Sequence, residues 1–226
     1  MILIIDFGSQ YTQLIAKNIR QLNFYCIIQP YNNFTIQSTI KGVILSGSPC
    51  SVNDDDYPNI NLDNINVPIL GICYGAQLIA HQNGCKIKSM ECKEYGSQKL
   101  QHILISNQLI KSDYDPNMIF WMSHGDSIIN ISENILPISY SESNILAIFK
   151  VKNKDIYGIQ FHAEVTQTNY GKRIFTNFIE DICGEKMEWK IDNIYTNIEN
   201  NIKNIIDDPK HINKNIIMAV SGGIDS

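Results

Sequence analysis

The sequence lacks an excess of positive charge. Its net charge of −5 at pH 7 leaves no basic face of the kind that binds nucleic acid. It also lacks an apolar run long enough to span a bilayer, and residues 1–6 have neither the basic segment nor the cleavage site of a secretion signal. We therefore expect a cytoplasmic protein that binds neither nucleic acid nor a membrane.

Closely spaced cysteine pairs are absent as well. The six cysteines are scattered and form no CxxC pair: Cys26, Cys50, Cys73, Cys85, Cys92 and Cys183. A disulfide framework is not expected in a domain of this size that forms a hydrophobic core, and the spacing of a metal site is missing. We expect no bound metal and a reducing compartment.

The chain does have enough apolar residues for a full core. It has 226 residues, 44% of them hydrophobic, which fits one or two domains. In its first part, short apolar runs alternate with helical or polar connections. The runs expected to form strands are residues 2–5, 25–28, 42–46 and 67–72, with an amphipathic helix over residues 10–22. This alternation predicts an α/β fold with a mostly parallel central sheet and flanking helices.

The rest of the chain differs from this alternation. Segments with short connections, for which we expect some antiparallel strand pairing, are residues 86–105, 119–122, 145–151 and 155–161. A helix over residues 170–182 would pack back on the sheet and close a first domain, residues 1–184. Residues 185–226 would form a linker, with a helix near residues 194–206, and the start of a second α/β domain. There a strand at residues 215–220 runs into a glycine-rich loop of the type that leads to a phosphate-binding helix.

Two distant segments carry the chemistry. GICYG, residues 71–75, lies between an apolar run and a helical stretch, in the strand–turn–helix order of a nucleophile elbow. The flanking glycines keep side-chain bulk away from the turn and hold the sulfur of Cys73 exposed, while the helix N-terminus favours its thiolate. Downstream, His162 would take the thiol proton and Glu164 would orient the imidazole. Together the segments predict cysteine-dependent acyl transfer, although each alone is also compatible with a buried structural cysteine or histidine.

Acyl transfer also needs hydrogen-bond donors for an oxyanion. The SGSP loop, residues 46–49, follows an expected strand and could direct backbone N–H groups at the nucleophile; an ordinary turn is the alternative. The N–H of Tyr74, next to the nucleophile, is the natural second donor.

At this point the motifs resemble a known family. GICYG, SGSP and FHAE (residues 161–164) are similar to the class I glutamine amidotransferases. DFGSQY (residues 6–11), SHGD (residues 123–126) and QFHAEV (residues 160–165) resemble, more particularly, the N-terminal glutaminase domain of the glutamine-hydrolysing GMP synthetases, over residues 1–184. SGGIDS resembles the pyrophosphate loop of the ATP pyrophosphatase domain that follows in that family; a chance glycine turn is the alternative.

The resemblance implies a role for each site residue. Cys73 would attack the glutamine side-chain amide to form a glutamyl thioester, with His162 as base and then acid and Glu164 as its orienting partner. The other implied positions are Ser48 and Tyr74 in the oxyanion hole, Gly47, Gln77 and Asp126 around the substrate, and Ser221, Gly222, Gly223, Ile224, Asp225 and Ser226 for ATP. Asp126 would pair with the α-amino group of glutamine.

Two positions need a separate expectation. Ser48 stands where the family usually has glycine. A backbone N–H survives this change, whereas a positive φ at Ser48 would add strain of about 1 kcal/mol or more. For His124 we expect a structural role in its loop.

The resemblance also implies cofactors and partners. Glutamine hydrolysis needs no cofactor. In the complete enzymes, ammonia passes to the ATP pyrophosphatase domain, where ATP with Mg²⁺ adenylylates XMP and ammonia displaces AMP to give GMP; a homodimer is possible there. Because the sequence stops at Ser226, we expect the glutaminase reaction alone from this chain.

Two other functions remain open. One is a glutaminase subunit of another synthase, such as one for anthranilate or aminodeoxychorismate, against which SHGD and SGGIDS count. The other is a catalytically inactive remnant that serves as an interaction module, against which the intact Cys73, His162 and Glu164 count.

Overall fold

The computed structural model describes residues 1–226 except residues 112, 191, 209, 211–214 and 216–226. The chain divides into two compact units, Met1–Trp189 and Lys190–Ser226. The second unit contains helix α4 (Asp192–Ile206), which confirms the helix predicted near residues 194–206. The predicted phosphate loop, residues 221–226, lies outside the described residues, as do residues 216–220 of the strand expected before it.

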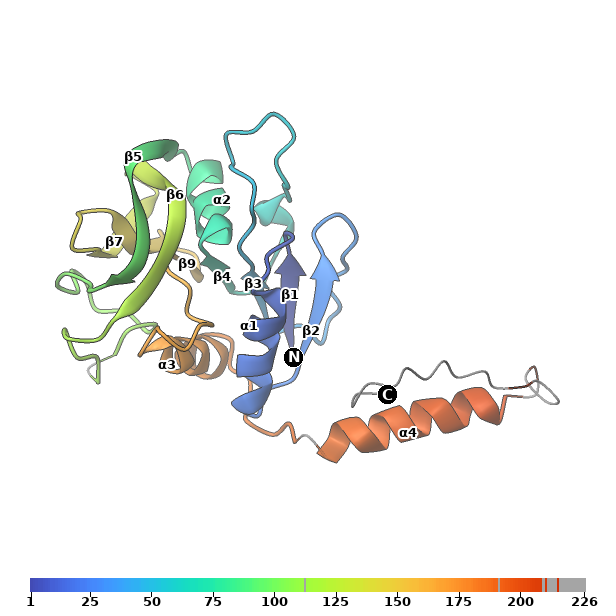
Figure 1. The fold of residues 1–226 in the computed structure, drawn as a ribbon. Coiled ribbons are helices and arrows are strands. Elements are labelled where there is room, and N and C mark those ends of the chain that lie inside the picture. The colour runs from blue at the N-terminus through green and yellow to red at the C-terminus, as the bar shows by residue number, and fades with distance from the viewer. Residues whose placement is uncertain (112, 191, 209, 211–214, 216–226) are drawn as a thin grey trace, which may run out of the picture. The chain divides into compact units, whose positions relative to one another are not determined.

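A seven-stranded sheet organises the first unit, with strand order β2-β1-β3-β4-β9-β8-β7 (Figure 1). The first five strands in this order run parallel, and β8 and β7 continue the sheet in antiparallel fashion. The strands are β1 (Ile2–Asp6), β2 (Cys26–Pro30), β3 (Gly42–Leu45), β4 (Ile69–Ile72), β7 (Ile135–Tyr140), β8 (Leu146–Val151) and β9 (Ile156–Ile159). The mostly parallel α/β sheet predicted from the sequence is therefore confirmed.

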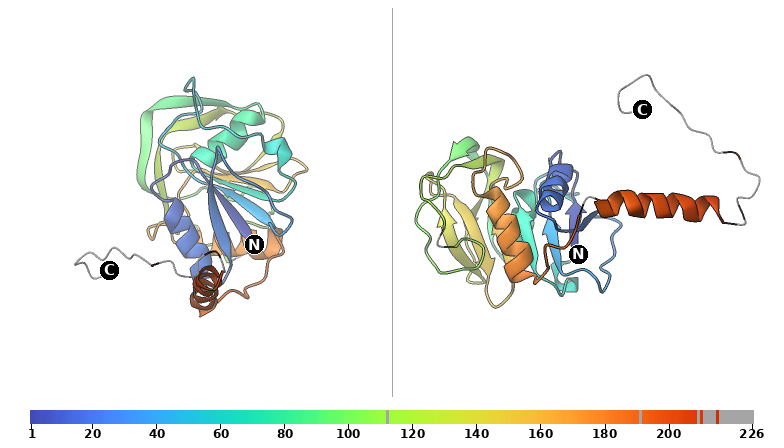
Figure 2. Two further views of the ribbon diagram at one scale, coloured as in Figure 1. Left: turned by 90° about the vertical axis from the view of Figure 1, so that its right-hand side faces the viewer. Right: turned by 90° about the horizontal axis from the view of Figure 1, so that it is seen from below.

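Helices cover both faces of this sheet (Figure 2). Along β1, Ile2 and Ile4 face one core while Leu3 and Ile5 face the other, and all four are fully buried. The helices α1 (Thr12–Gln21) and α3 (Gly171–Thr176) pack on the first face, and α2 (Tyr74–Gln82) packs on the second. Strands buried on both faces read as continuous apolar runs, which is why the sequence reveals them.

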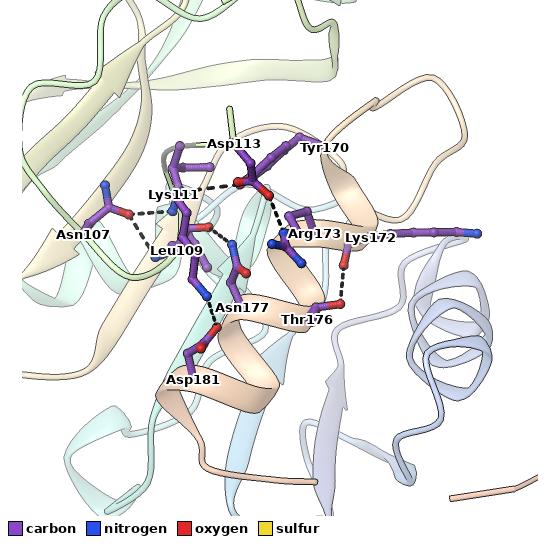
Figure 3. Close-up of polar contacts among 11 residues, drawn as sticks. Asn107, Leu109, Lys111, Asp113, Tyr170, Lys172, Arg173, Thr176, Asn177 and Asp181 are labelled. Atoms are coloured by element: carbon purple, nitrogen blue, oxygen red, sulfur yellow. Dashed lines mark hydrogen bonds and ion pairs between the residues drawn. The ribbon is translucent and has the colours of Figure 1, made fainter. Parts of the chain in front are cut away.

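The helix predicted over residues 170–182 is present, but its pitch changes. After α3 the chain continues as a π-helix, Asn177–Ile182. Together, α3 and the π-helix bind the connection between β5 and β6 through side-chain contacts (Figure 3). The contacts are Arg173 Nε to Asp113 Oδ2 at 2.6 Å, Lys111 Nζ to Asp181 Oδ2 at 2.6 Å, and Asn177 Nδ2 to Leu109 O at 2.9 Å. Because Asn177 is fully buried, its bond is sheltered from water, whereas the two ion pairs lie at the surface.

A second sheet consists of the antiparallel strands β5 (Lys86–Gln98) and β6 (Phe120–Asn130). The antiparallel pairing predicted for the middle of the chain is confirmed. Two expectations are wrong: β5 ends at Gln98 instead of residue 105, and His124 lies within β6 instead of in a loop. The neighbouring residues Ser123, Gly125 and Asp126 line a pocket. This part of the strand is therefore polar and resembles a loop in the sequence.

Strand β7 was missed from the sequence. It carries Pro137, which cannot donate a ladder hydrogen bond. The strand tolerates proline because it lies at the edge of the sheet, next to β8 alone. Residues 101 and 104 donate backbone hydrogen bonds to the carbonyls of Tyr140 and Ile138, so an irregular segment covers this edge where a strand was predicted.

The turn from β4 into α2 depends on two close approaches. A Cβ atom on Gly71 would lie 2.5 Å from the carbonyl carbon of Gly75, and one on Gly75 would lie 2.6 Å from Leu45 O. Both contacts are with backbone atoms, which cannot turn aside. The predicted need for glycine on each side of Cys73 is therefore confirmed.

We predict that Gly75→Ala destabilises the domain by about 1–3 kcal/mol, because the new methyl group forces α2 away from β3. Denaturant unfolding measures this change. Gly125→Ala is the matched control, since its nearest neighbour would be the flexible Lys93 side chain at 3.5 Å. Equal stabilities of the two variants would contradict the prediction.

Candidate active site

A pocket of about 530 Å³ lies beyond the carboxyl ends of β1, β3 and β4. The β5–β6 pair closes one of its sides. Its lining includes Gly8, Ser9, Gln10, Tyr11, Gly47, Ser48, Pro49, Cys50, Ser51, Cys73, Tyr74, Gln77, Tyr95, Ser123, His124, Gly125, Asp126 and His162. Sheets of this type bind their ligands at this edge, because the loops that follow parallel strands converge there.

Cys73 occupies the turn between β4 and α2 with φ +53° and ψ −105°. A residue other than glycine is strained in this region, and such strain is held only where the surroundings fix the backbone. Here the Cys73 N–H donates to Ile159 O at 2.8 Å, and Cys73 O accepts from the N–H of Gln77 at 3.0 Å. The side chain lines the pocket, but Cys73 is only 7% exposed, so the expectation of an exposed sulfur is wrong.

His162 and Glu164 follow β9, and the His162 side chain lines the same pocket. His162 Nδ1 lies 2.7 Å from Glu164 Oε1, and both side chains are almost fully buried. Burial by itself would lower the pKa of His162. Its hydrogen bonds to Cys73 and Glu164, with the charges of both groups, outweigh burial and raise that pKa to about 10. The arrangement therefore favours a charged imidazolium next to the sulfur.

Further contacts fix this histidine. Tyr11 packs edge-on against its ring at a centroid distance of 5.0 Å, and Thr168 Oγ1 donates to His162 O at 2.5 Å. Asn18 Nδ2, from α1, donates to Glu164 O at 2.8 Å. The loop that carries both His162 and Glu164 is thus tied to α1 and to its own following turn.

Gln77 and Asp126 lie together on the pocket wall. Gln77 Nε2 donates to Asp126 O at 2.9 Å and to Gln160 Oε1 at 3.3 Å. Gln160 Nε2 lies in turn 3.8 Å from Cys73 Sγ. The Asp126 carboxylate accepts a hydrogen bond from Ser51 Oγ. A series of contacts therefore runs from the backbone carbonyl of Asp126 through Gln77 and Gln160 to the sulfur of Cys73.

The two expected oxyanion positions also line the pocket. Tyr74 is the first residue of α2, so its N–H has no acceptor within the helix. Ser48 directly follows Gly47, and its Oγ accepts from the N–H of Cys50 at 3.2 Å. The described residues with a positive φ do not include Ser48, so serine here avoids the strain that a left-handed conformation would cause.

The sequence reasoning overlooked several residues that shape the site. Gln160 stood in a quoted motif but was given no role. Ser51 and Glu94 lie in no motif at all, and only the folded chain brings them to Asp126 and His124. No local pattern could have identified these two, because their partners are 75 and 30 residues away.

The described part of the chain offers neither a metal cluster nor a membrane-spanning helix. There, no group of three or more His, Cys, Asp or Glu side chains is placed to hold a metal ion. Among the helices in that part, none combines the length and apolar character needed to cross a membrane.

Comparison with known proteins identifies the family. The family model for glutamine amidotransferase class-I matches residues 3–182. GMP synthase [glutamine-hydrolyzing] of Cytophaga hutchinsonii is 45% identical over the whole of this chain, which covers 44% of that protein. The Bacteroides fragilis GMP synthase is 40% identical, with the same coverage of both chains.

A solved structure shows the same likeness. The crystal structure of a Thermoplasma acidophilum protein described as a GMP synthase subunit superposes with a TM-score of 0.68 at 29% identity. The match covers 88% of this chain and 96% of that one. This chain spans less than half the length of the curated relatives named above. With its fold, its pocket and the family model over most of its length in agreement, the chain belongs to the class I glutamine amidotransferases.

Proposed function

We propose that this chain hydrolyses glutamine at Cys73 and supplies the ammonia to a synthetase domain that converts XMP to GMP. One observation supports the glutaminase reaction above all. Of the two cysteines that line the pocket, the buried one, Cys73, lies beside a buried His162–Glu164 pair joined at 2.7 Å, whereas Cys50 is exposed. Compact nucleophile–base–carboxylate arrangements of this kind carry out acyl transfer on unrelated folds.

The acylation step follows from the proton held on His162. The Cys73 thiolate attacks the side-chain amide carbon of glutamine, and the carbonyl oxygen becomes an oxyanion near the N–H groups of Ser48 and Tyr74. The carbon–nitrogen bond then breaks while the His162 imidazolium gives its proton to the departing nitrogen. Ammonia leaves, and a glutamyl thioester remains on Cys73.

Hydrolysis of the thioester returns the site to its starting state. Neutral His162 takes a proton from water, whose oxygen attacks the thioester carbon, and the carbon–sulfur bond breaks to release glutamate and the Cys73 thiolate. Glu164 keeps the imidazole in the orientation required for both steps, because its carboxylate accepts a hydrogen bond from Nδ1–H.

The substrate would lie between the elbow and β6. We assign the α-ammonium group of glutamine to the carboxylate of Asp126, which lines the pocket wall. Gln77 supports this wall through its bond to Asp126 O. A Cβ on Gly47 would lie 3.3 Å from Ser9 Oγ and 3.6 Å from His162 Cε1, so glycine keeps the space between these two side chains open.

The proposed partner is an ATP pyrophosphatase domain of the type that completes a glutamine-hydrolysing GMP synthetase. Curated GMP synthases match this chain along its whole length, which favours this partner over the synthases for anthranilate or aminodeoxychorismate. We assign residues 1–184 to the glutaminase domain and residues 185–226 to the linker and the start of the next domain. ATP and Mg²⁺ would serve that domain, with Ser221–Ser226 at the pyrophosphate; a homodimer of the complete enzyme and a cytoplasmic location belong to the same proposal.

The nucleophile is tested by Cys73→Ala. We expect this change to reduce ammonia release from glutamine to background, because alanine leaves the strained turn without a nucleophile. The free thiol of Cys183, beside Gly42 at the amino end of β3, offers a matched control, and Cys183→Ala should keep its activity. Full hydrolysis by the Cys73→Ala protein would remove the assignment.

The orienting carboxylate is tested by Glu164→Gln. The amide keeps an oxygen for His162 Nδ1 but removes the negative charge that raises the histidine pKa. In the unchanged protein, hydrolysis should decline only as the pH approaches that value, about 10, where the imidazolium loses its proton. In Glu164→Gln this alkaline decline should move to lower pH, and kcat should fall by about 10²–10⁴-fold. A pH–rate profile measures both, and an unshifted alkaline limb would contradict the role of Glu164.

The partner is tested by reconstitution. We expect the chain, mixed with the C-terminal part of the Cytophaga hutchinsonii relative, to form GMP from XMP, ATP, Mg²⁺ and glutamine. Cys73→Ala should block this synthesis with glutamine but allow it with an ammonium salt, because free ammonia bypasses the thioester. Glutamine hydrolysis without any GMP in the mixture would argue for a different synthetase partner.

A further inference from the structure

We infer that Glu94 and His124 form a buried positioning pair that holds Asp126 in place for the α-ammonium group of glutamine. This inference rests on the proposed function, because it takes glutamine as the ligand and Asp126 as its partner. Neither Glu94 nor His124 would touch the reacting atoms; both act through Asp126.

The pair is a well-defined contact between the two strands of the small sheet. His124 Nε2 lies 3.0 Å from Glu94 Oε2, and His124 Nδ1 lies 3.0 Å from Asp126 O. Ser141 Oγ donates to the other carboxylate oxygen of Glu94 at 2.7 Å. Glu94 and His124 are each about 5% exposed or less, so the pair is removed from water.

These contacts occupy both ring nitrogens of His124. A carbonyl oxygen can only accept a hydrogen bond, so His124 Nδ1 must donate to Asp126 O. Burial raises the pKa of Glu94, but hydrogen bonds from His124 and Ser141 outweigh it and hold that pKa below its ordinary value. The other ring nitrogen, Nε2, is held by the Glu94 side chain. With both ring nitrogens engaged by the protein, His124 is a positioning residue and not a second catalytic base.

The pair sits where the strand register is interrupted. Ser89 pairs with Asp126 and Glu94 pairs with His124, so residues 90–93 of β5 bulge opposite the single residue Gly125 of β6. A bulge loosens the ladder locally and redirects nearby side chains. Glu94 and His124 are the first pair beyond this bulge, and their side-chain contact secures the register at the pocket wall.

The pair contacts Asp126 directly through His124. Its carbonyl oxygen accepts from His124 Nδ1 and from Gln77 Nε2 at 2.9 Å, which fixes the backbone from the strand and from α2. Among the residues that the structure describes, the carboxylate accepts one hydrogen bond, from Ser51 Oγ, and Asp126 lines the pocket. A carboxylate on a fixed backbone binds an ammonium group without first losing conformational freedom.

The test compares two ligands on the Cys73→Ala protein, which cannot turn them over. Glutamine carries the α-ammonium group, and glutaramate is the same molecule without it. By NMR titration we expect glutamine to bind about tenfold or more tightly than glutaramate, as a charge-assisted hydrogen bond provides. Adding Glu94→Ala or His124→Phe should remove this preference by weakening glutamine alone.

Three further variants make the outcome specific. Glu94→Gln should retain most of the preference, because the amide can accept from Ser141 and donate to His124 Nε2 while Nδ1 still holds Asp126. Ser141→Ala removes the hydroxyl that donates to Glu94 and accepts from the N–H of Ile145 at 3.3 Å, and it should lower the preference about threefold. Glu133→Ala removes a carboxylate from the exposed turn after β6 and should change nothing.

The decisive result is the ratio of the two affinities. If Glu94→Ala loses binding of both glutamine and glutaramate, the pocket has collapsed and the inference is overturned. A preserved preference for glutamine in that variant would overturn it as well. If Glu94→Ala and His124→Phe do not fold, an unchanged ratio in Ser141→Ala overturns it. Failure of the proposed function looks different: the protein with Cys73 intact would show the preference for glutamine but release no ammonia.

Discussion

The backbone turn at Cys73 is the constraint from which the rest of the site follows. A positive φ at a residue other than glycine persists only where neighbours hold it, and here two hydrogen bonds and two glycine contacts do so. Gly75 N–H donates to Ser46 O at 3.1 Å, which places the loop after β3 beside the elbow. The Cys73 N–H binds Ile159 O, so β9 ends next to the elbow and His162 follows three residues later.

Buried charge is the second constraint. The pocket is flanked by two histidine–glutamate pairs, His162–Glu164 and His124–Glu94, and each member would be costly to bury without the other. The first pair keeps a proton next to the sulfur, where the reaction uses it. The second has no nitrogen free for catalysis and secures the strand that carries Asp126. The same pair of residue types thus serves catalysis in one place and positioning in the other. The hydrogen-bond partners of each histidine determine its role.

Much of the fold could be predicted because its signals are local. The inner parallel strands β3, β4 and β9 are buried on both faces, and α1 shows one buried stripe, with Ile15 and Ile19 fully buried. The predictions that were wrong involve segments whose environment is not local. Pro137 is unfavourable in most strands, so β7, which is permitted only at the edge of the sheet, was not predicted. The polar residues around His124 are typical of a loop, so most of β6, which faces a pocket, was not predicted either.

The sequence by itself determined the elbow, because glycine, cysteine and glycine between a strand and a helix specify a tight turn within five residues. It also determined the His162–Glu164 pair, whose members are two residues apart and bond directly. Only the tertiary structure decided that Ser51 reaches Asp126, that Gln160 lies beside Cys73, and that Glu94 meets His124 next to a bulge. These contacts depend on strand order and register, which arise when distant segments pack together and leave no trace in the local pattern of residues.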